Sequence, residues 1–338
     1  MSSALICLNC GNEYGADCCD NPRPAGDGTL GGIGFPPPES IAVAKDPPPG
    51  EVQTPAQPAD AGIWVGADVV PEGAFRISSL GYGRSGKTTY LGMLYFLLTQ
   101  GRFPGYRFAW SDSLRELETI RAQLFRSPQQ GGPAFPPRTD VDKTLFLHLG
   151  LRRWADARYC DVYFPEFSGE DVARVWSEGS YPKNLQFLKD FNGYMVFVDC
   201  SATSALDTGR YLSLIAGLLE LKGGLRLEEP VAVLLSKWDL VADQGLSPEE
   251  FFKRRFGGLY EAWRGQCKAL EVFGVSAVGD VRELTGHDGL PLKRDGEVLR
   301  VPAPAREVLP DDETCFHYRP RNVSRPLLWL LDQLGGQA

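Results

Sequence analysis

The strongest chemical signal in this sequence is a glycine-rich loop that ends in a lysine and a threonine. Residues 81–88 read GYGRSGKT and match the pattern G-x-x-x-x-G-K-[ST] at every fixed position. Glycines at this spacing let the backbone wrap tightly, so that several N–H groups can point at one anion. Lys87 would reach the β- and γ-phosphates of a nucleotide, and the hydroxyl of Thr88 would hold Mg²⁺. The predicted phosphate-binding residues are Gly81, Gly83, Arg84, Ser85, Gly86, Lys87, Thr88 and Thr89.

The segments on either side of the loop fit this interpretation. Residues 74–80 are expected to form a short strand that enters the loop, and the apolar run 89–99 a buried helix that leaves it. The N-terminus of a helix adds its own positive end to a phosphate site. A plain glycine-rich turn with an exposed lysine is the alternative, and the strand–loop–helix setting disfavours it.

A second short motif bears on which base the nucleotide carries. Ser236, Lys237, Trp238 and Asp239 follow a strand expected at 231–235. A carboxylate in that place can accept hydrogen bonds from N1–H and the 2-amino group of guanine. Adenine lacks both donors, so the carboxylate would be left unpaired at a cost of roughly 1–3 kcal/mol. An exposed polar turn at the end of a strand is the alternative interpretation.

Taken in chain order, these motifs resemble those of the translation-factor-related (TRAFAC) class of P-loop GTPases. Ser236–Asp239 is similar to the guanine-reading [NT]-K-x-D motif, with serine in place of asparagine or threonine, and Ser276-Ala277 resembles the Ser-Ala loop after the next strand. The resemblance covers residues 73–335 and looks closest to the bacterial double-GTPase group of multi-protein systems. It implies a mainly parallel six-stranded sheet with helices on both faces, Mg·GTP at the carboxyl ends of the strands, and loops that respond to the γ-phosphate.

The same resemblance suggests residues for hydrolysis, and here the sequence departs from the pattern. Glu166 stands where the family has the aspartate of D-x-x-G, and Gly169 keeps the glycine. Glu170 replaces the water-positioning glutamine, so it would either orient the attacking water or be inert. These departures question hydrolysis more than binding. Thr139, with Thr144 as its rival, is expected to meet Mg²⁺ and the γ-phosphate.

Two arginines and a long connection complete the predicted site. Arg138 or Arg84 would act as an internal arginine finger that neutralises charge in the transition state. Residues 100–138 are far longer than the Ras-like connection, and we expect protein partners to bind through this insertion and through the amino-terminal segment.

The amino-terminal segment has a different composition. Cys7, Cys10, Cys18 and Cys19 form a C-x2-C-x7-C-C cluster within residues 1–20. Four thiolates can close a tetrahedral Zn²⁺ site, and free thiols are the alternative. Residues 21–60 hold ten prolines and six glycines, which predicts a flexible linker before a globular GTPase domain at 61–335.

Composition limits the remaining classes. The chain has 338 residues, a net charge of −8 and 43% hydrophobic residues, enough for a substantial core. No apolar run approaches the roughly 20 residues of a membrane span, and no signal peptide is visible, so we expect a cytoplasmic protein. No basic stripe indicates nucleic-acid binding. The three histidines lie outside any nucleophile pattern.

The rest of the chain alternates between strand and helix patterns, which predicts an α/β fold. Helices are expected at 111–125, 205–221 and 325–334, and several helical segments at 247–270. Strands are expected at 144–151, 158–164, 194–200 and 272–275, and a hairpin at 290–301. Three functions fit: a GTPase that acts as a switch, a nucleotide-gated interaction module that does not hydrolyse GTP, and an ATP-using P-loop protein such as a small kinase. Use of Asp239 would separate the third from the others.

Overall fold

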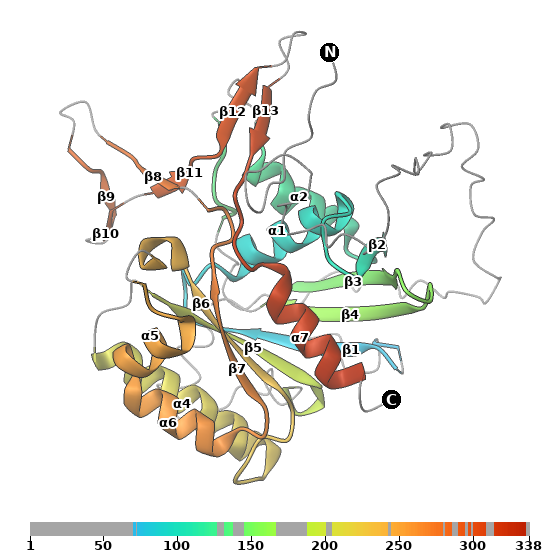
Figure 1. Cartoon of the computed structure of the whole chain (residues 1–338), viewed down its shortest axis with the longest axis vertical. Helices are drawn as coiled ribbons and strands as arrows, with labels where there is room; N and C mark the ends of the chain where they lie inside the picture. Colours follow the sequence, from blue (N-terminus) through green and yellow to red (C-terminus); the bar gives the residue numbers. More distant parts are fainter. Residues whose placement is uncertain are drawn as a thin grey trace, which may run out of the picture.

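A seven-stranded sheet forms the centre of the molecule, which we describe from a computed structural model (Figure 1). The structure describes residues 70–71, 73–126, 132–137, 145–166, 188–200, 205–242, 245–279, 281–285, 290–294, 297–298, 300–308 and 314–335. The strand order is β2-β3-β4-β1-β5-β6-β7. The five strands β4, β1, β5, β6 and β7 run parallel to one another. The strands are β1 (Phe75–Leu80), β2 (Tyr106–Trp110), β3 (Leu145–Arg153), β4 (Tyr159–Glu166), β5 (Gly193–Asp199), β6 (Val231–Ser236) and β7 (Leu270–Val275).

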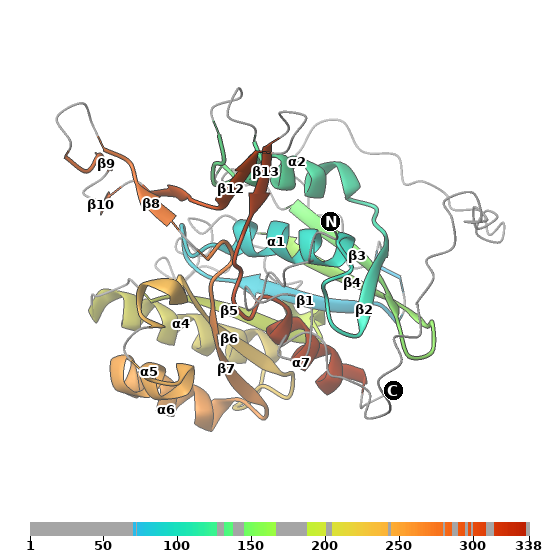
Figure 2. The ribbon, with the colours of Figure 1, turned by 45° about the horizontal axis from the view of Figure 1, so that its top comes forward.

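Helices cover both faces of this sheet (Figure 2). Side chains of α1, α2 and α7 share one hydrophobic core with the sheet, and those of α4, α5 and α6 share the other. The helices are α1 (Lys87–Thr99), α2 (Leu114–Leu124), α4 (Ala205–Lys222), α5 (Pro248–Arg255), α6 (Gly257–Gln266) and α7 (Ser324–Gly335). None of the helices in the described ranges is long and apolar enough to cross a membrane.

The central strands owe their place to continuous apolar sequence. All six residues of β6 are buried, as are six of the seven residues of β5. Strands covered by helices on both faces need such runs, because both sets of alternating side chains enter a core. This arrangement confirms the predicted α/β class and brings the carboxyl ends of β1, β5, β6 and β7 to one edge of the sheet.

One prediction about the elements, the number of strands in the sheet, needs correction. The sheet has seven strands rather than six, because β2 pairs antiparallel with β3 at its edge. The helical segments expected at 247–270 are α5 and α6, which are separate because the backbone leaves helical geometry at Phe256, before Gly257. Ser247 begins α5 with a capping box: its hydroxyl accepts from the N–H of Glu250, whose carboxylate accepts from the N–H of Ser247.

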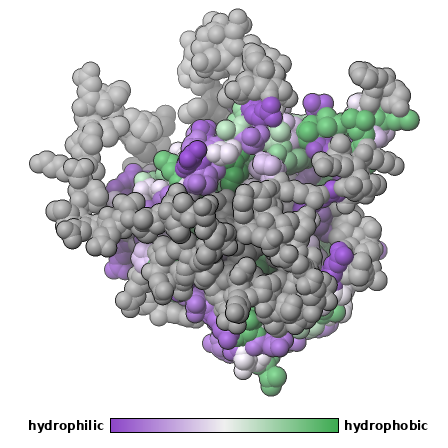
Figure 3. Space-filling view, turned by 180° about the vertical axis from the view of Figure 1, so that it is seen from behind, coloured by the Kyte–Doolittle hydropathy of each residue, from purple (hydrophilic) through white to green (hydrophobic). Residues whose placement is uncertain are grey.

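Residues 281–317, which we call the arm, follow the sheet and contain short antiparallel pairs (Figure 1). The pairs are β8 (Val281–Glu283) with β11 (Arg300–Pro302), β9 (Lys293–Arg294) with β10 (Glu297–Val298), and β12 (Ala305–Val308) with β13 (Thr314–His317). The β9–β10 pair confirms a hairpin within 290–301. Leu290 and Leu292 are 64% and 43% exposed, and hydrophobic surface is visible on the projection at the upper right of Figure 3.

Candidate nucleotide site

The glycine-rich loop joins β1 to α1, as predicted, and its backbone is tightly wound. Arg84 and Gly86 have φ angles of 66° and 87°, in the left-handed region. Gly81 has no room for a side chain, because a Cβ there would lie 2.8 Å from the Ser85 hydroxyl and 2.9 Å from Phe197. The loop therefore has the compact form that a phosphate-binding loop requires.

Lys87 begins α1 with its ammonium folded back over this loop. The side chain is only 6% exposed, and Nζ donates to the carbonyl oxygens of Gly81, at 2.7 Å, and Tyr82, at 3.3 Å. Main-chain oxygens offset the cost of burying the cation. These contacts hold the ammonium over the anion-binding loop.

Ser85, within the loop, carries an unsatisfied polar atom. Ser85 is 2% exposed, and its hydroxyl finds no hydrogen-bond partner in the part of the chain that the structure describes. A buried hydroxyl without a partner costs roughly 1–3 kcal/mol. Together with the space that Gly81 leaves, this atom makes the loop a fit for a polar ligand such as a phosphate group.

The second motif lies at the same edge of the sheet, after β6. Ser236 pairs in register with Asp199 of β5 and with Val275 of β7, and its hydroxyl donates to the carbonyl oxygen of Val198 at 3.3 Å. Lys237 has a φ angle of 57° and its ammonium forms an ion pair with Asp199. This pair fixes the direction of the lysine side chain at the carboxyl end of β5.

Asp239 is held on one side only. Its Oδ1 accepts a hydrogen bond from the hydroxyl of Ser276 at 2.6 Å, and no residue of the described part of the chain bonds to its other oxygen. Ser276 is 1% exposed, and its hydroxyl also accepts from the N–H of Gly279 at 3.0 Å. One carboxylate oxygen is thus anchored, which leaves the other for a ligand.

Trp238 forms the floor beneath these polar groups. Its ring is buried and meets Phe251 edge-on, with 5.3 Å between ring centroids. A Cβ on Gly274 of β7 would lie 2.5 Å from the indole, so glycine is required there. Because Trp238 lies between Lys237 and Asp239 in the sequence, its packing on Phe251 and Gly274 helps to fix the position of both residues.

The other predicted site residues are placed only in part. Glu166 ends β4 in register with Ser79 of β1, and nothing is described of its side chain. Ala277 packs partly buried against the core, and Thr89 is 8% exposed within α1. The remaining predicted residues lie outside the described ranges: Cys7, Cys10, Cys18, Cys19, Arg138, Thr139, Thr144, Gly169 and Glu170. Within those ranges no group of three or more His, Cys, Asp or Glu side chains could hold a metal ion.

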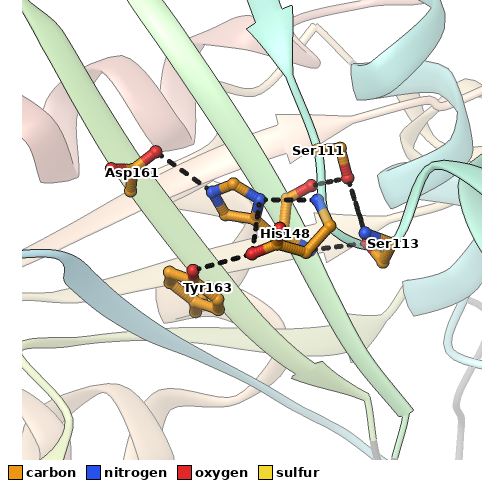
Figure 4. Close-up of polar contacts among 6 residues, drawn as sticks. Ser111, Ser113, His148, Asp161 and Tyr163 are labelled. Carbon is orange, nitrogen blue, oxygen red and sulfur yellow. Dashed lines mark hydrogen bonds and ion pairs between the residues drawn. The ribbon is translucent and has the colours of Figure 1, made fainter. Parts of the chain in front are cut away.

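A buried histidine that the sequence did not indicate lies in β3, within a network of polar contacts (Figure 4). His148 of β3 is 1% exposed and stacks on Tyr163 with 4.4 Å between ring centroids. Its Nδ1 accepts from the N–H of Asp112 at 3.0 Å, so the ring proton lies on Nε2, which is 3.1 Å from Asp161. Both ring nitrogens are satisfied, which indicates a structural role.

This histidine connects the start of α2 to the sheet. The hydroxyl of Ser111 donates to the carbonyl oxygen of His148 at 2.6 Å, and the N–H of His148 donates to the hydroxyl of Ser113 at 2.8 Å. The long connection after α1 is therefore fixed to β3 where α2 begins. Successive side chains of β3 point to opposite faces of the sheet, and Leu147 and Leu149 face the core. This alternation was the only sequence signal that placed His148 on the other face.

Comparison with known proteins agrees with this nucleotide-binding architecture. The chain belongs to the Double-GTPase 2 family, whose model matches residues 76–279, more than half of its length. Curated proteins gave no match. A crystal structure of a GTP-binding protein from the hyperthermophilic archaeon Sulfolobus solfataricus in complex with GDP is 12% identical, covers 60% of this chain and 47% of its own, and has a TM-score of 0.31. Two mutation variants of SsGBP are 13% identical, with the same 60% coverage of this chain, 51% and 50% of theirs, and TM-scores of 0.30 and 0.31. The chain thus spans about half the length of these proteins.

Proposed function

We propose that this protein binds GTP with Mg²⁺ and hydrolyses it to GDP, and so acts as a nucleotide-dependent switch in a multi-protein system. The observation that carries the proposal is Asp239, anchored through one oxygen by Ser276 at the same sheet edge as the glycine-rich loop. A carboxylate held in this way can accept from two neighbouring donors, one at its unbonded oxygen and one at the second lone pair of Oδ1; guanine has both donors and adenine lacks them. Membership in the Double-GTPase 2 family supports the same choice of nucleotide.

The phosphates would be held by the loop itself. Lys87 brings a positive charge, the N–H groups of residues 83–88 bring donors, and the start of α1 adds its dipole. The hydroxyl of Thr88 would hold Mg²⁺, which when bound neutralises charge on the β- and γ-phosphates. Ser85 offers a further polar atom inside the loop.

The base would lie against Lys237 and Asp239. Because Asp199 holds the ammonium of Lys237, this side chain is already ordered. A base that packs along its aliphatic stem would therefore cost little conformational entropy. The hydroxyl of Ser236 bonds to the carbonyl oxygen of Val198. We expect this bond to hold the loop in place, as the asparagine or threonine of the family would. We expect guanine affinity to be somewhat weaker than with the longer asparagine.

Hydrolysis is assigned to Glu166 and Glu170 with Arg138, and Thr139 would complete the Mg²⁺ site. The glutamates replace an aspartate and a glutamine, which favours a second candidate function: an interaction module that binds GTP without hydrolysing it. In either case the insertion at 100–138 is the proposed surface for a partner protein.

Two measurements test these statements in order. Calorimetric titration of the full chain with GTP and with ATP, each with Mg²⁺, should give heat of binding for GTP at concentrations where ATP gives none. Equal affinities, or a preference for ATP, would overturn the assignment of Asp239 as a base reader. Single-turnover assays with GTP then decide between the enzyme, which releases phosphate, and the module, which does not.

A further inference from the structure

The chain returns from the arm along the loop that holds Asp239. We call residues 318–323 the strap. Within it, Arg321 forms an antiparallel bridge with Ser276: the N–H of Ser276 donates to the carbonyl oxygen of Arg321 at 3.1 Å, and the N–H of Arg321 donates back at 2.8 Å. Ser276 is the residue that anchors Asp239, so the strap and the carboxylate share one support.

Two further contacts fix the strap to this loop. Asn322 has a φ angle of 56°, and its side-chain amide donates to the carbonyl oxygen of Gly274 at 3.0 Å. On the other side, a Cβ on Gly279 would lie 2.3 Å from the carbonyl oxygen of Arg319, and the φ angle of Gly279 is 76°. The strap therefore contacts the segment 274–279 before, at and after Ser276.

The strap also reaches the helix that follows the phosphate loop. The hydroxyl of Tyr90, which is 1% exposed, donates to the carbonyl oxygen of Val323 at 2.8 Å. The hydroxyl of Tyr318 donates to the carbonyl oxygen of Leu124 at the end of α2. These buried hydrogen bonds give the strap a rigid base on α1 and α2.

We propose that the strap is a positioning element for guanine recognition, with Asn322 as its fixing residue. The proposal rests on the proposed function and extends it. Asn322 holds the strap on Gly274, the strap holds the main chain of Ser276, and Ser276 holds the carboxylate of Asp239 toward the base.

The test uses two variants of Asn322 and a matched control in the full chain. Asn322→Asp keeps the shape and the tolerance of positive φ, but sets a carboxylate against the carbonyl oxygen of Gly274. Asn322→Gly keeps the backbone conformation and removes the donor without adding charge. The control is Asn192→Asp, the same chemical change just before β5, at the amino ends of the parallel strands. There the side-chain Oδ1 accepts from the N–H of Arg76 at 2.8 Å, and an aspartate keeps this acceptor.

Two quantities are measured: the rate of GDP dissociation, and the ratio of the affinities for GDP and IDP, whose base lacks the 2-amino group. Both Asn322 variants should release GDP about three- to tenfold faster, as expected for the loss of one hydrogen bond, and the preference for GDP should fall by a similar factor. Asn192→Asp should match the unmodified protein in both.

Each outcome decides one statement. If the unmodified protein does not bind GDP, the proposed function fails. If it binds GDP selectively and both Asn322 variants keep that rate and that ratio, the inference about the strap is wrong and the proposed function stands. Faster release with an unchanged ratio of GDP to IDP affinity would also overturn positioning, because a general loss of stability has that effect.

Discussion

The proposed base-reading residues, Lys237 and Asp239 with Ser276, which we call the base end, and the proposed phosphate loop, residues 81–88, lie at the same edge of the sheet but differ in how their polar groups are satisfied. At the base end, Asp239 is bonded to Ser276 and Lys237 is paired with Asp199. In the phosphate loop, the hydroxyl of Ser85 has no partner among the described residues, and Lys87 bonds to main-chain oxygens of its own loop.

This difference separates selectivity from affinity. Groups that are already ordered lose little entropy on binding, so the base end would choose between bases at low cost. The phosphate loop gains more from a ligand, because an anion supplies hydrogen bonds that the loop lacks and that are stronger when charged. We therefore expect substitutions in the loop to weaken every nucleotide, and those at the base end to change the choice among nucleotides.

The largest effect is expected for Lys87→Ala. Loss of the ammonium removes charge-assisted hydrogen bonds to phosphate, so affinities for GTP and GDP should fall by roughly 100-fold or more. Calorimetric titration measures both. Unchanged affinity would refute the phosphate site.

Lys222→Ala is the matched control for this variant. The ammonium of Lys222 also bonds to main-chain oxygens, of Lys189 at 2.6 Å and Phe191 at 3.3 Å, and is paired with Glu229, at the far edge of the sheet. It should lower the melting temperature and leave nucleotide affinity as it was. A loss of affinity here would mean that any disturbed lysine weakens binding.

Asp239→Asn should have the next largest effect, and only on the choice of base. The amide oxygen still accepts from Ser276, so the loop keeps its support, while one acceptor for guanine becomes a donor. GDP affinity should fall by about 10- to 100-fold, with xanthine nucleotides gaining, since their second carbonyl group accepts a hydrogen bond. Competition between GDP and XDP measures the change. An unaltered nucleotide profile would show that Asp239 does not read the base.

Much of the glycine-rich loop and of the neighbouring strands could be predicted from the sequence because their signals are local. The loop has a fixed pattern of glycines, and the runs that became β5 and β6 are apolar throughout. The observed bounds differ from the expected 194–200 by one residue at each end of β5, and from the expected 231–235 by one residue at the carboxyl end of β6. Continuous burial leaves little choice of conformation for such segments.

The parts that were missed depend on partners distant in sequence. β2 is an edge strand that ends in two exposed residues, so its own pattern is weak, and its pairing with β3 defines it. Apart from the predicted hairpin β9–β10, the arm's strands have three or four residues, too few for periodicity to show. The strap holds Ser276 through main-chain atoms, which leave no trace in side-chain pattern, and neither Gly279 nor Asn322 had any distinguishing context.

A smaller effect is expected from Gly274→Ala, beneath the base end. The added methyl group would meet the indole of Trp238, so the ring must shift, at a cost of about 1–3 kcal/mol in the free energy of unfolding. GDP affinity should fall by about three- to tenfold, because Asp239 follows the ring. Chemical denaturation and titration measure the two effects.

Gly209→Ala provides the control, since nothing lies within 4 Å of a Cβ there and the residue is inside α4. That substitution should raise stability by about 0.5–1 kcal/mol and leave affinity unchanged. If both glycine variants behaved alike, the packing of Trp238 would have no part in the base end.

The smallest effect is expected for the alkylation rate of Cys200, which GDP should leave unchanged. This rate reports whether the base end is assembled without nucleotide. This thiol is 4% exposed, and its pKa is raised by burial first and then by the carboxylates of Asp199 and Asp239. The N–H of Cys200 donates to the carbonyl oxygen of Ser236 at 3.1 Å, so its protection depends on the ends of β5 and β6 staying together. Since thiolate is the reactive form, alkylation near pH 8 should be far slower than in the unfolded chain, and GDP should leave its rate unchanged. Mass spectrometry resolves the modification of each cysteine. A fast reaction that GDP suppresses would show that the base end opens in the absence of ligand, and the contrast with the phosphate loop would then be lost.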